Sequence, residues 1–126
     1  MKGAYERNAA EYRELYYRFH HDVDGPIDRV RKAVTDNADD AVLVFSADHG
    51  DLLGSHGGLH QKWYQLYDEA VRVPFQIARV GAQASVGASI ERTPTSHIDL
   101  LPTLLGFAGA DEAELAEMLT QTHSEV

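Results

Sequence analysis

The residues best suited to chemistry lie in one loop, Asp48–Lys62, whose sequence is DHGDLLGSHGGLHQK. Asp48 and His49 are adjacent, and neighbouring side chains on an extended strand point to opposite faces. Both can therefore face one ion only if the chain turns after them, and Gly50 is the residue that permits the turn. A carboxylate and an imidazole supply half of a divalent-metal site. The alternative is a polar turn that holds no ligand.

The rest of this loop offers further polar side chains. His56 and His60 are four residues apart, but the glycines around them disfavour the helix that would bring both to one face. Lys62 is the only lysine after Lys32. A cation beside a metal site suits an anionic substrate oxygen, although a lone lysine commonly extends into solvent. For Asp51 we favour a role in capping the turn.

A long helix over about residues 5–34 is expected to precede the loop. Its apolar side chains recur at steps of three and four, which places them on one helix face. They are Tyr12, Leu15, Tyr16, Phe19, Val23, Ile27, Val30 and Val34. The Gly25–Pro26 pair predicts a kink in this helix, or a new helix with Pro26 in its first turn.

The loop itself follows a predicted strand over about residues 41–47, an unbroken apolar run typical of a strand buried on both faces of a parallel sheet. A second strand is expected at about 73–80, and helices at about 97–108 and 111–120. Ser96 and Asp99 form a capping-box pattern before the first of these helices. The order of these helices and strands along the chain favours an α/β fold with a mostly parallel sheet covered by helices. That fold is incomplete in this chain, because two strands cannot form a covered sheet.

The composition of the chain excludes several classes of partner and site. The 126 residues include 20 acidic and 11 basic side chains, for a net charge of −9, which would repel a nucleic-acid backbone or an anionic membrane. Cysteine is absent, so disulfides and a cysteine nucleophile are excluded from the chain. No run of about 18 apolar residues predicts a membrane span. The first residues lack the apolar stretch of a signal peptide, which favours the cytoplasm and otherwise leaves localisation open.

Three stretches carry a resemblance to a known family. They are FSADHGDLLGSHG at 45–57 followed by Lys62, VRVP at 71–74, and IDLLPTLL at 98–105. In this order they resemble the sulfatase family of the alkaline-phosphatase superfamily. The resemblance covers roughly residues 12–109 and only the later portion of that family's catalytic domain. It implies a partial alkaline-phosphatase-like fold, with residues 1–126 a fragment of a single catalytic domain.

The resemblance also implies roles for four residues of the loop. Asp48 and His49 match the family's second pair of metal ligands, and Lys62 matches the lysine that contacts the sulfate or the leaving-group oxygen. His60 is a second candidate for substrate contact. Calcium is the ion expected first, with manganese or another divalent ion as the alternative, since imidazole also suits transition metals. Many members of the family have Asp-Asn at these two positions. With Asp-His, this chain more closely resembles the branch that includes choline-sulfatase-like and phosphonate-monoester-hydrolase-like enzymes.

The family's nucleophile is expected on a missing part of the protein. Sulfatases carry a Cys-x-Pro-Ser-Arg or Ser-x-Pro-Ser-Arg segment whose first residue becomes formylglycine, and neither pattern occurs here. We therefore expect a metal-assisted hydrolase of small sulfate esters that is inactive as this chain alone. Its expected partner is the missing N-terminal portion or a second copy. The alternatives are part of a phosphonate monoester hydrolase or phosphodiesterase of the same superfamily, and a non-catalytic metal-binding or assembly module.

Overall fold

The computed structural model describes residues 7–81, 84, 87–111, 113, 114, 116, 117 and 120. The chain divides into two compact units, Met1–Ser85 and Val86–Val126. The first unit contains the helices α2, α3 and α4 and the strands β1 and β2, and the second contains the 3₁₀ turn η1 and the helix α5. Each unit is described by itself below.

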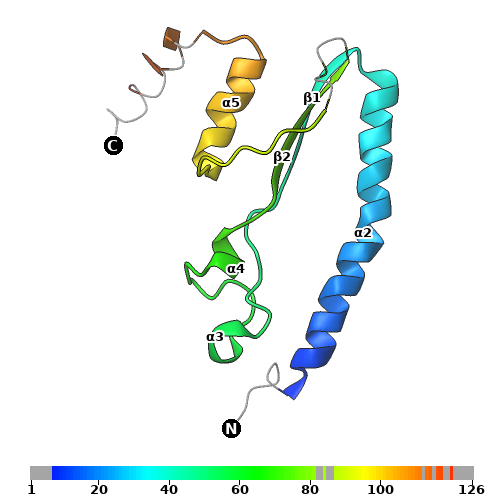
Figure 1. Cartoon of the computed structure of the whole chain (residues 1–126), viewed down its shortest axis with the longest axis vertical. Helices are drawn as coiled ribbons and strands as arrows, with labels where there is room; N and C mark the ends of the chain where they lie inside the picture. The colour runs from blue at the N-terminus through cyan, green and yellow to red at the C-terminus, as the bar shows by residue number, and fades with distance from the viewer. Residues whose placement is uncertain are drawn as a thin grey trace. The chain divides into compact units, whose positions relative to one another are not determined.

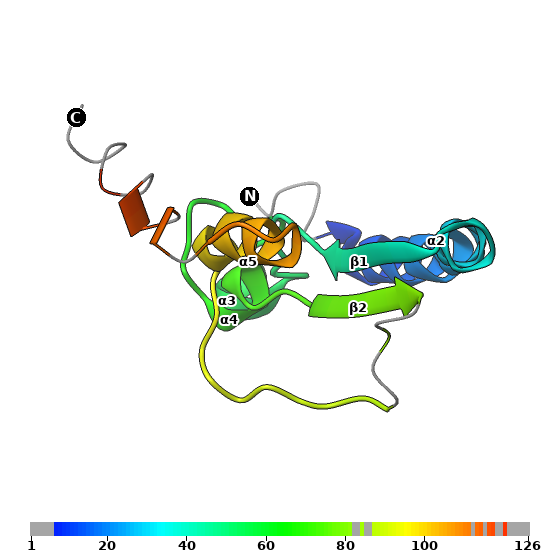
Figure 2. The same cartoon turned by 90° about the horizontal axis from the view of Figure 1, so that it is seen from above.

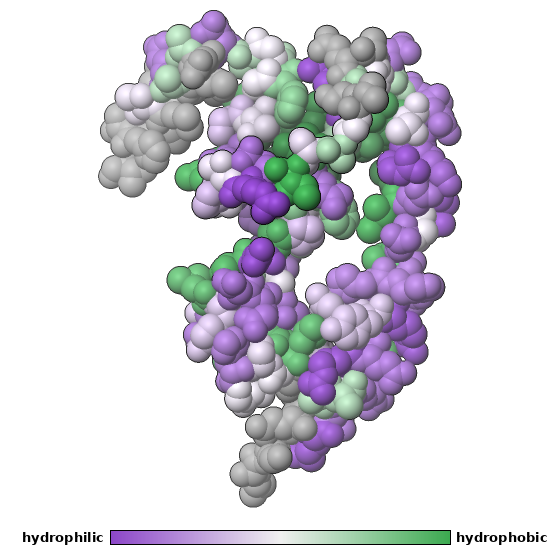
Figure 3. All heavy atoms as spheres, viewed as in Figure 1, coloured by the Kyte–Doolittle hydropathy of each residue, from purple (hydrophilic) through white to green (hydrophobic). Residues whose placement is uncertain are grey.

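Helix α2 spans Ala9–Asn37 as one helix of 29 residues (Figure 1). It ends three residues later than the sequence predicts and continues through Pro26, so the alternative of a new helix starting at this proline is wrong. The predicted apolar face is covered only near the helix ends. Phe19 and Val30 remain 57% and 62% exposed, and no described residue of α2 is buried. Apolar surface is accordingly visible along α2 in the space-filling view (Figure 3).

Strands β1, Asp40–Ser46, and β2, Phe75–Gly81, form a two-stranded antiparallel sheet (Figure 2). In its register Val44 lies opposite Ile77. The mixed α/β class is confirmed, but the expected parallel arrangement does not hold for this pair. A parallel return requires a crossover, usually a helix, and the connection contains only two four-residue helices, α3 at Ser55–Gly58 and α4 at Asp68–Val71. The chain therefore returns antiparallel.

The best-packed part of the first unit is the connection between its two strands. Among the described residues only Leu52 and Ala70 are buried, at 1% and 2% exposure. The N–H of Leu52 donates to the carbonyl of Gln61, and the carbonyl of Ala70 accepts the N–H of Gly50. This hydrogen bonding folds the predicted 48–62 loop into an ordered structure that contains α3 and lies beside α4.

The second unit contains η1, His97–Asp99, followed by α5, Leu100–Phe107. These bounds confirm the helix predicted at 97–108. The backbone N–H of Ser96 donates to Asp99 Oδ2 over 2.7 Å, which is the Asp99 half of the predicted capping box. Within the helix predicted at 111–120, the described residues 113, 114, 116, 117 and 120 are helical, and residues 112, 115, 118 and 119 lie outside the described residues. No helix in the described part of the chain has both the length and the apolar composition needed to cross a membrane.

Candidate metal and anion site

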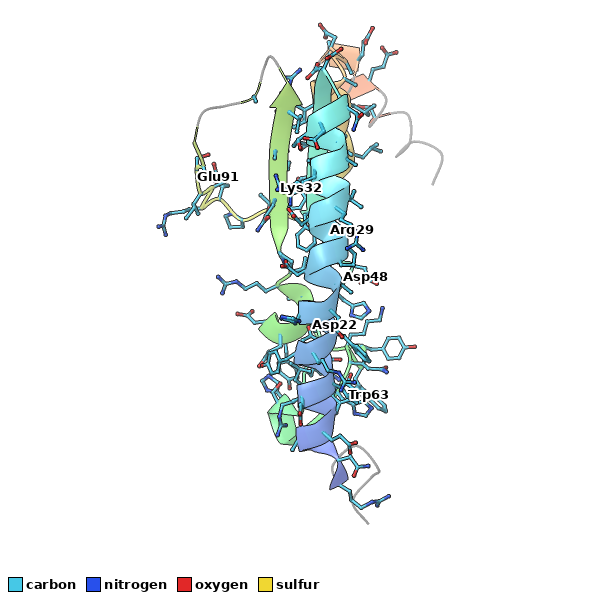
Figure 4. The ribbon with its side chains drawn as sticks, turned by 90° about the vertical axis from the view of Figure 1, so that its right-hand side faces the viewer. Asp22, Arg29, Lys32, Asp48, Trp63 and Glu91 are labelled. Atoms are coloured by element: carbon cyan, nitrogen blue, oxygen red, sulfur yellow. The ribbon has the colours of Figure 1, made fainter. Side chains whose placement is uncertain are left out.

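Asp48 and His49 lie just past the end of β1, where the connecting loop begins. Asp48 is labelled in Figure 4. The Oδ2 atom of Asp48 and the Nε2 atom of His49 are 3.5 Å apart. Two ligand atoms bound to one divalent ion lie about 3 to 4 Å from each other, given metal–ligand distances of about 2.0–2.6 Å. The structure thus turns these neighbouring side chains toward a common point, as a shared ion would require.

The other ring nitrogen of His49 is held by its own loop. Nδ1 lies 2.8 Å from the carbonyl oxygen of Gly50, and because a carbonyl can only accept, Nδ1 carries the proton. In the neutral ring Nε2 then presents its lone pair on the side of Asp48. A histidine that binds metal usually donates its second nitrogen to a carbonyl or carboxylate in this way. Asp48 is 86% exposed at its side chain and His49 35%, so an ion can reach the pair from solvent.

This donor set is half of a metal site. No group of three or more His, Cys, Asp or Glu side chains that could hold an ion occurs within the described residues. One carboxylate and one imidazole fit Ca²⁺ or Mn²⁺ as part of a larger set of oxygen and nitrogen donors.

Gly50 is required here for a different reason from the one that the sequence indicates. Its φ is not among the positive values of the chain. A Cβ atom at this position would instead lie 1.9 Å from the backbone carbonyl oxygen of Glu69. The Gly50 N–H donates to the carbonyl of Ala70 over 2.8 Å. The close approach of α4 to the loop, rather than a left-handed turn, therefore excludes any side chain at residue 50.

Asp51 has the structural role that the sequence favours, and it makes one contact that the sequence did not indicate. Its Oδ1 accepts the N–H of Leu53 over 2.8 Å and the N–H of Gln61 over 3.0 Å. Its Oδ2 accepts the hydroxyl of Tyr12 over 2.6 Å. One carboxylate therefore caps the turn and also joins the loop to α2.

The two substrate-contact candidates lie farther along the loop. The His60 ring makes edge contacts with Tyr12, at a centroid distance of 6.4 Å, and with Trp63, at 5.2 Å. Lys62 is exposed and lies between Gln61 and Trp63, whose φ values are 55° and 38°. Such left-handed values cost an ordinary residue about 1–2 kcal/mol and tend to cluster at functional sites.

Sequence reasoning missed a contact between α3 and α4. The Nε2 atom of His56 lies 3.1 and 3.2 Å from the two carboxylate oxygens of Glu69, and the His56 ring stacks on Tyr67 at 3.6 Å with an interplanar angle of 5°. Hydrogen bonds from the backbone N–H of Glu69 itself and from His56 hold the pKa of the Glu69 carboxyl below its ordinary value. The isolated sequence contains no signal for this pairing.

Comparison with known proteins supports one family. The Sulfatase family model matches residues 2–110. An uncharacterized sulfatase, YidJ, from Escherichia coli is 34% identical over 103 residues, covering 80% of this chain and 20% of that protein. A choline-sulfatase from Rhizobium meliloti is 35% identical over 79 residues, covering 61% and 14%.

A further relative is named for a broader group of enzymes. The multifunctional alkaline phosphatase superfamily protein PehA from Trinickia caryophylli is 34% identical over 73 residues, covering 58% of this chain and 14% of that protein. The chain thus spans a fifth or less of the length of these three relatives. No solved structure matches it.

Proposed function

Because the chain belongs to the sulfatase family, we propose that it supplies part of the active site of a metal-dependent hydrolase of sulfuric esters. The proposed metal ligands are Asp48 and His49. The observation that carries this role is the 3.5 Å separation of Asp48 Oδ2 and His49 Nε2, with His49 Nδ1 bonded to the Gly50 carbonyl. Calcium is the proposed ion, with manganese as the alternative.

Each of the proposed site residues has a distinct chemical task. Asp48 contributes negative charge, and His49 contributes a neutral nitrogen donor in a fixed tautomer. A divalent ion bound there would polarise the ester oxygens. Lys62 binds the sulfate or leaving-group oxygen and neutralises its charge. His60 is the second proposed substrate contact, on the loop between Asp51 and Lys62.

We propose that the nucleophile and the remaining metal ligands come from residues outside these 126. The chain contains no cysteine and no Ser-x-Pro-Ser-Arg segment, so the residue from which formylglycine would form is not among these 126. Large apolar side chains of the first unit are also exposed, among them Phe19, Val30 and Phe45 at 57%, 62% and 43%. The rest of a sulfatase domain, as a separate polypeptide or a continuation of this one, would cover such surfaces. As this chain alone, the protein is proposed to be inactive toward sulfate esters.

Titration of the chain with Mn²⁺, followed by NMR line broadening, tests the metal ligands. The chain contains a matched control, His21 and Asp22 on α2, whose Nδ1 and Oδ1 atoms lie 3.6 Å apart. Both His-Asp pairs have nearly the same separation, but only His49 is held by a second-nitrogen bond to a carbonyl. Signals of Asp48 and His49 should broaden first, and Asp48→Ala should abolish this effect. Equal broadening of both pairs would contradict the assignment.

An assay with 4-nitrophenyl sulfate in calcium or manganese tests the rest of the proposal. No turnover is expected, so turnover that disappears in Asp48→Ala would show that the nucleophile lies within the chain.

The second candidate is a phosphonate monoester hydrolase or phosphodiesterase of the same superfamily. It is supported by His49 and by the similarity to the multifunctional protein PehA. Methyl sulfate and methyl phosphonate can be compared as probes of the Lys62 Nζ resonance. A larger shift with methyl phosphonate would favour this second candidate over a sulfatase.

A further inference from the structure

A second side-chain cluster lies outside the proposed metal ligands and joins the two short helices. It consists of His56 of α3, Tyr67, which directly precedes α4, and Glu69 of α4. The Nε2 atom of His56 reaches both Glu69 carboxylate oxygens, at 3.1 and 3.2 Å. Because a carboxylate only accepts, Nε2 carries the proton. The face of the same ring lies parallel to Tyr67 at a centroid distance of 3.6 Å.

The backbone of His56 is under strain in this arrangement. Its φ and ψ are 52° and 44°, a left-handed conformation that costs a residue with a Cβ about 1–2 kcal/mol. Such a conformation persists where surrounding contacts determine it. The stacking on Tyr67 and the hydrogen bond to Glu69 are the contacts that hold the His56 side chain in this position.

Glu69 connects this cluster to the loop that contains the proposed ligands. Its side chain contacts His56, while its backbone carbonyl lies so close to Gly50 that a Cβ there would be 1.9 Å from it. The next residue, Ala70, accepts the Gly50 N–H over 2.8 Å. Gly50 in turn accepts the Nδ1 proton of His49. A continuous series of contacts therefore runs from His56 to His49.

We propose that His56, Tyr67 and Glu69 form a positioning cluster that fixes Gly50 against α4. The Gly50 carbonyl then holds His49 in the tautomer that is protonated at Nδ1 and unprotonated at Nε2. The ligand role of His49 rests on the proposed function, whereas the control of its tautomer does not. His56 is a positioning residue in this scheme. Its Nε2 is bonded to Glu69 and one face of its ring is covered by Tyr67.

The tautomer of His49 is the direct measurement, since a general loss of stability would not change it selectively. Ring ¹⁵N spectra are recorded for the full chain at alkaline pH, where an ordinary imidazole is neutral. In the parent chain His49 should be protonated at Nδ1. In His56→Ala and in Glu69→Ala the ring should shift toward the Nε2-protonated form, and hydrogen exchange at the Gly50 amide should become about threefold faster.

Asp28→Asn is the matched control. It breaks the ion pairs of Asp28 with Arg31 and Lys32, which are about as exposed as the His56–Glu69 pair but lie on α2. It should leave the His49 tautomer and Gly50 exchange unchanged. The conservative variant Glu69→Gln keeps an acceptor for His56 and should retain more of the parent tautomer than Glu69→Ala does. An unchanged His49 tautomer in both alanine variants, with thermal unfolding still cooperative, would overturn the proposal.

Mn²⁺ affinity separates this proposal from the proposed function. Weaker Mn²⁺ binding in Glu69→Ala, together with the tautomer change, supports both. If the parent chain does not bind Mn²⁺ but the His49 tautomer still changes in the alanine variants, the positioning cluster is supported and the metal site is contradicted. Unchanged tautomer and exchange beside intact Mn²⁺ binding would contradict the positioning cluster alone.

Discussion

The hydroxyl of Tyr12 and the Oδ2 atom of Asp51 are joined by a 2.6 Å hydrogen bond across 39 residues of chain. Tyr12 lies near the start of α2, and Asp51 is two residues beyond His49. The guanidinium of Arg13 adds a 3.3 Å hydrogen bond to the carbonyl of Leu53. The first turns of α2 are therefore fastened to the loop that carries the proposed ligands, whereas the middle of the helix has large exposed apolar side chains.

Tyr12→Phe should weaken this attachment by about 1 kcal/mol, because the phenol hydroxyl is lost while the ring remains. The loss should appear as a lower midpoint of urea unfolding and as faster amide exchange at Leu53 and Gln61, whose N–H groups share the Asp51 carboxylate. Tyr17→Phe is the control, because the side chain of Tyr17 is 64% exposed. Equal effects of the two variants would show that the Tyr12 hydroxyl contributes nothing specific.

Gly50→Ala should destabilise the first unit by at least about 2 kcal/mol, because the new methyl group collides with the Glu69 carbonyl, a backbone atom that can move only if α4 moves. Gly25→Ala is the contrasting change. The nearest atom to its new Cβ is Arg29 Nη1 at 3.8 Å, and alanine favours the helix by about 0.5–1 kcal/mol. Denaturant unfolding of both variants should therefore move in opposite directions, and a neutral Gly50→Ala would contradict the close approach.

The sequence indicates where the candidate site lies because the relevant signals are local. An unbroken apolar run followed by Asp48 and His49 indicates a strand that ends in polar side chains. Whether the two side chains face one point depends on the turn, and sequence explains that turn by the flexibility of Gly50. The structure replaces this reason with the approach of Glu69, which is 19 residues away in sequence and could not be foreseen from local propensity.

The missed contact between His56 and Glu69 has a similar physical origin. Both lie in short helices of four residues, too short for periodicity to reveal a face. Strand direction was also missed, because a continuous apolar run favours a parallel strand only if the connection can cross the sheet. The 28 residues between β1 and β2 contain no helix long enough for that crossing.

The ion pairs of Asp28 should make α2 sensitive to acid. A side-chain hydrogen bond from Lys32, then one from Arg31, lowers the pKa of the Asp28 carboxyl from its ordinary value of 3.8. The folded chain therefore binds fewer protons than the unfolded chain, and the stabilisation is present above pH 3.8 and is lost as the pH falls through the lowered pKa. Circular dichroism should show a smaller loss of helix on acidification in Asp28→Asn than in the parent. Asp36→Asn, which changes another carboxylate of α2, should follow the parent.

Acid should also release the contact between Glu69 and His56. The pKa of Glu69 is lowered from its ordinary value of 4.5, first by a hydrogen bond from its own backbone N–H and then by the His56 side chain. The contact therefore stabilises the fold above pH 4.5 and is lost as the pH falls through the lowered pKa. Protonation removes both the charge and one acceptor, so His56 should separate from Glu69.

NMR chemical shifts recorded during acidification test this link. The Gly50 ¹⁵N shift should change together with the shift of the Glu69 carboxyl carbon, and Glu69→Gln should abolish this change in the Gly50 shift. In Glu91→Gln, which changes a carboxyl of the second unit whose pKa is also lowered, the change in the Gly50 shift should persist. A Gly50 shift that does not follow the Glu69 titration would contradict the link between the cluster and the loop.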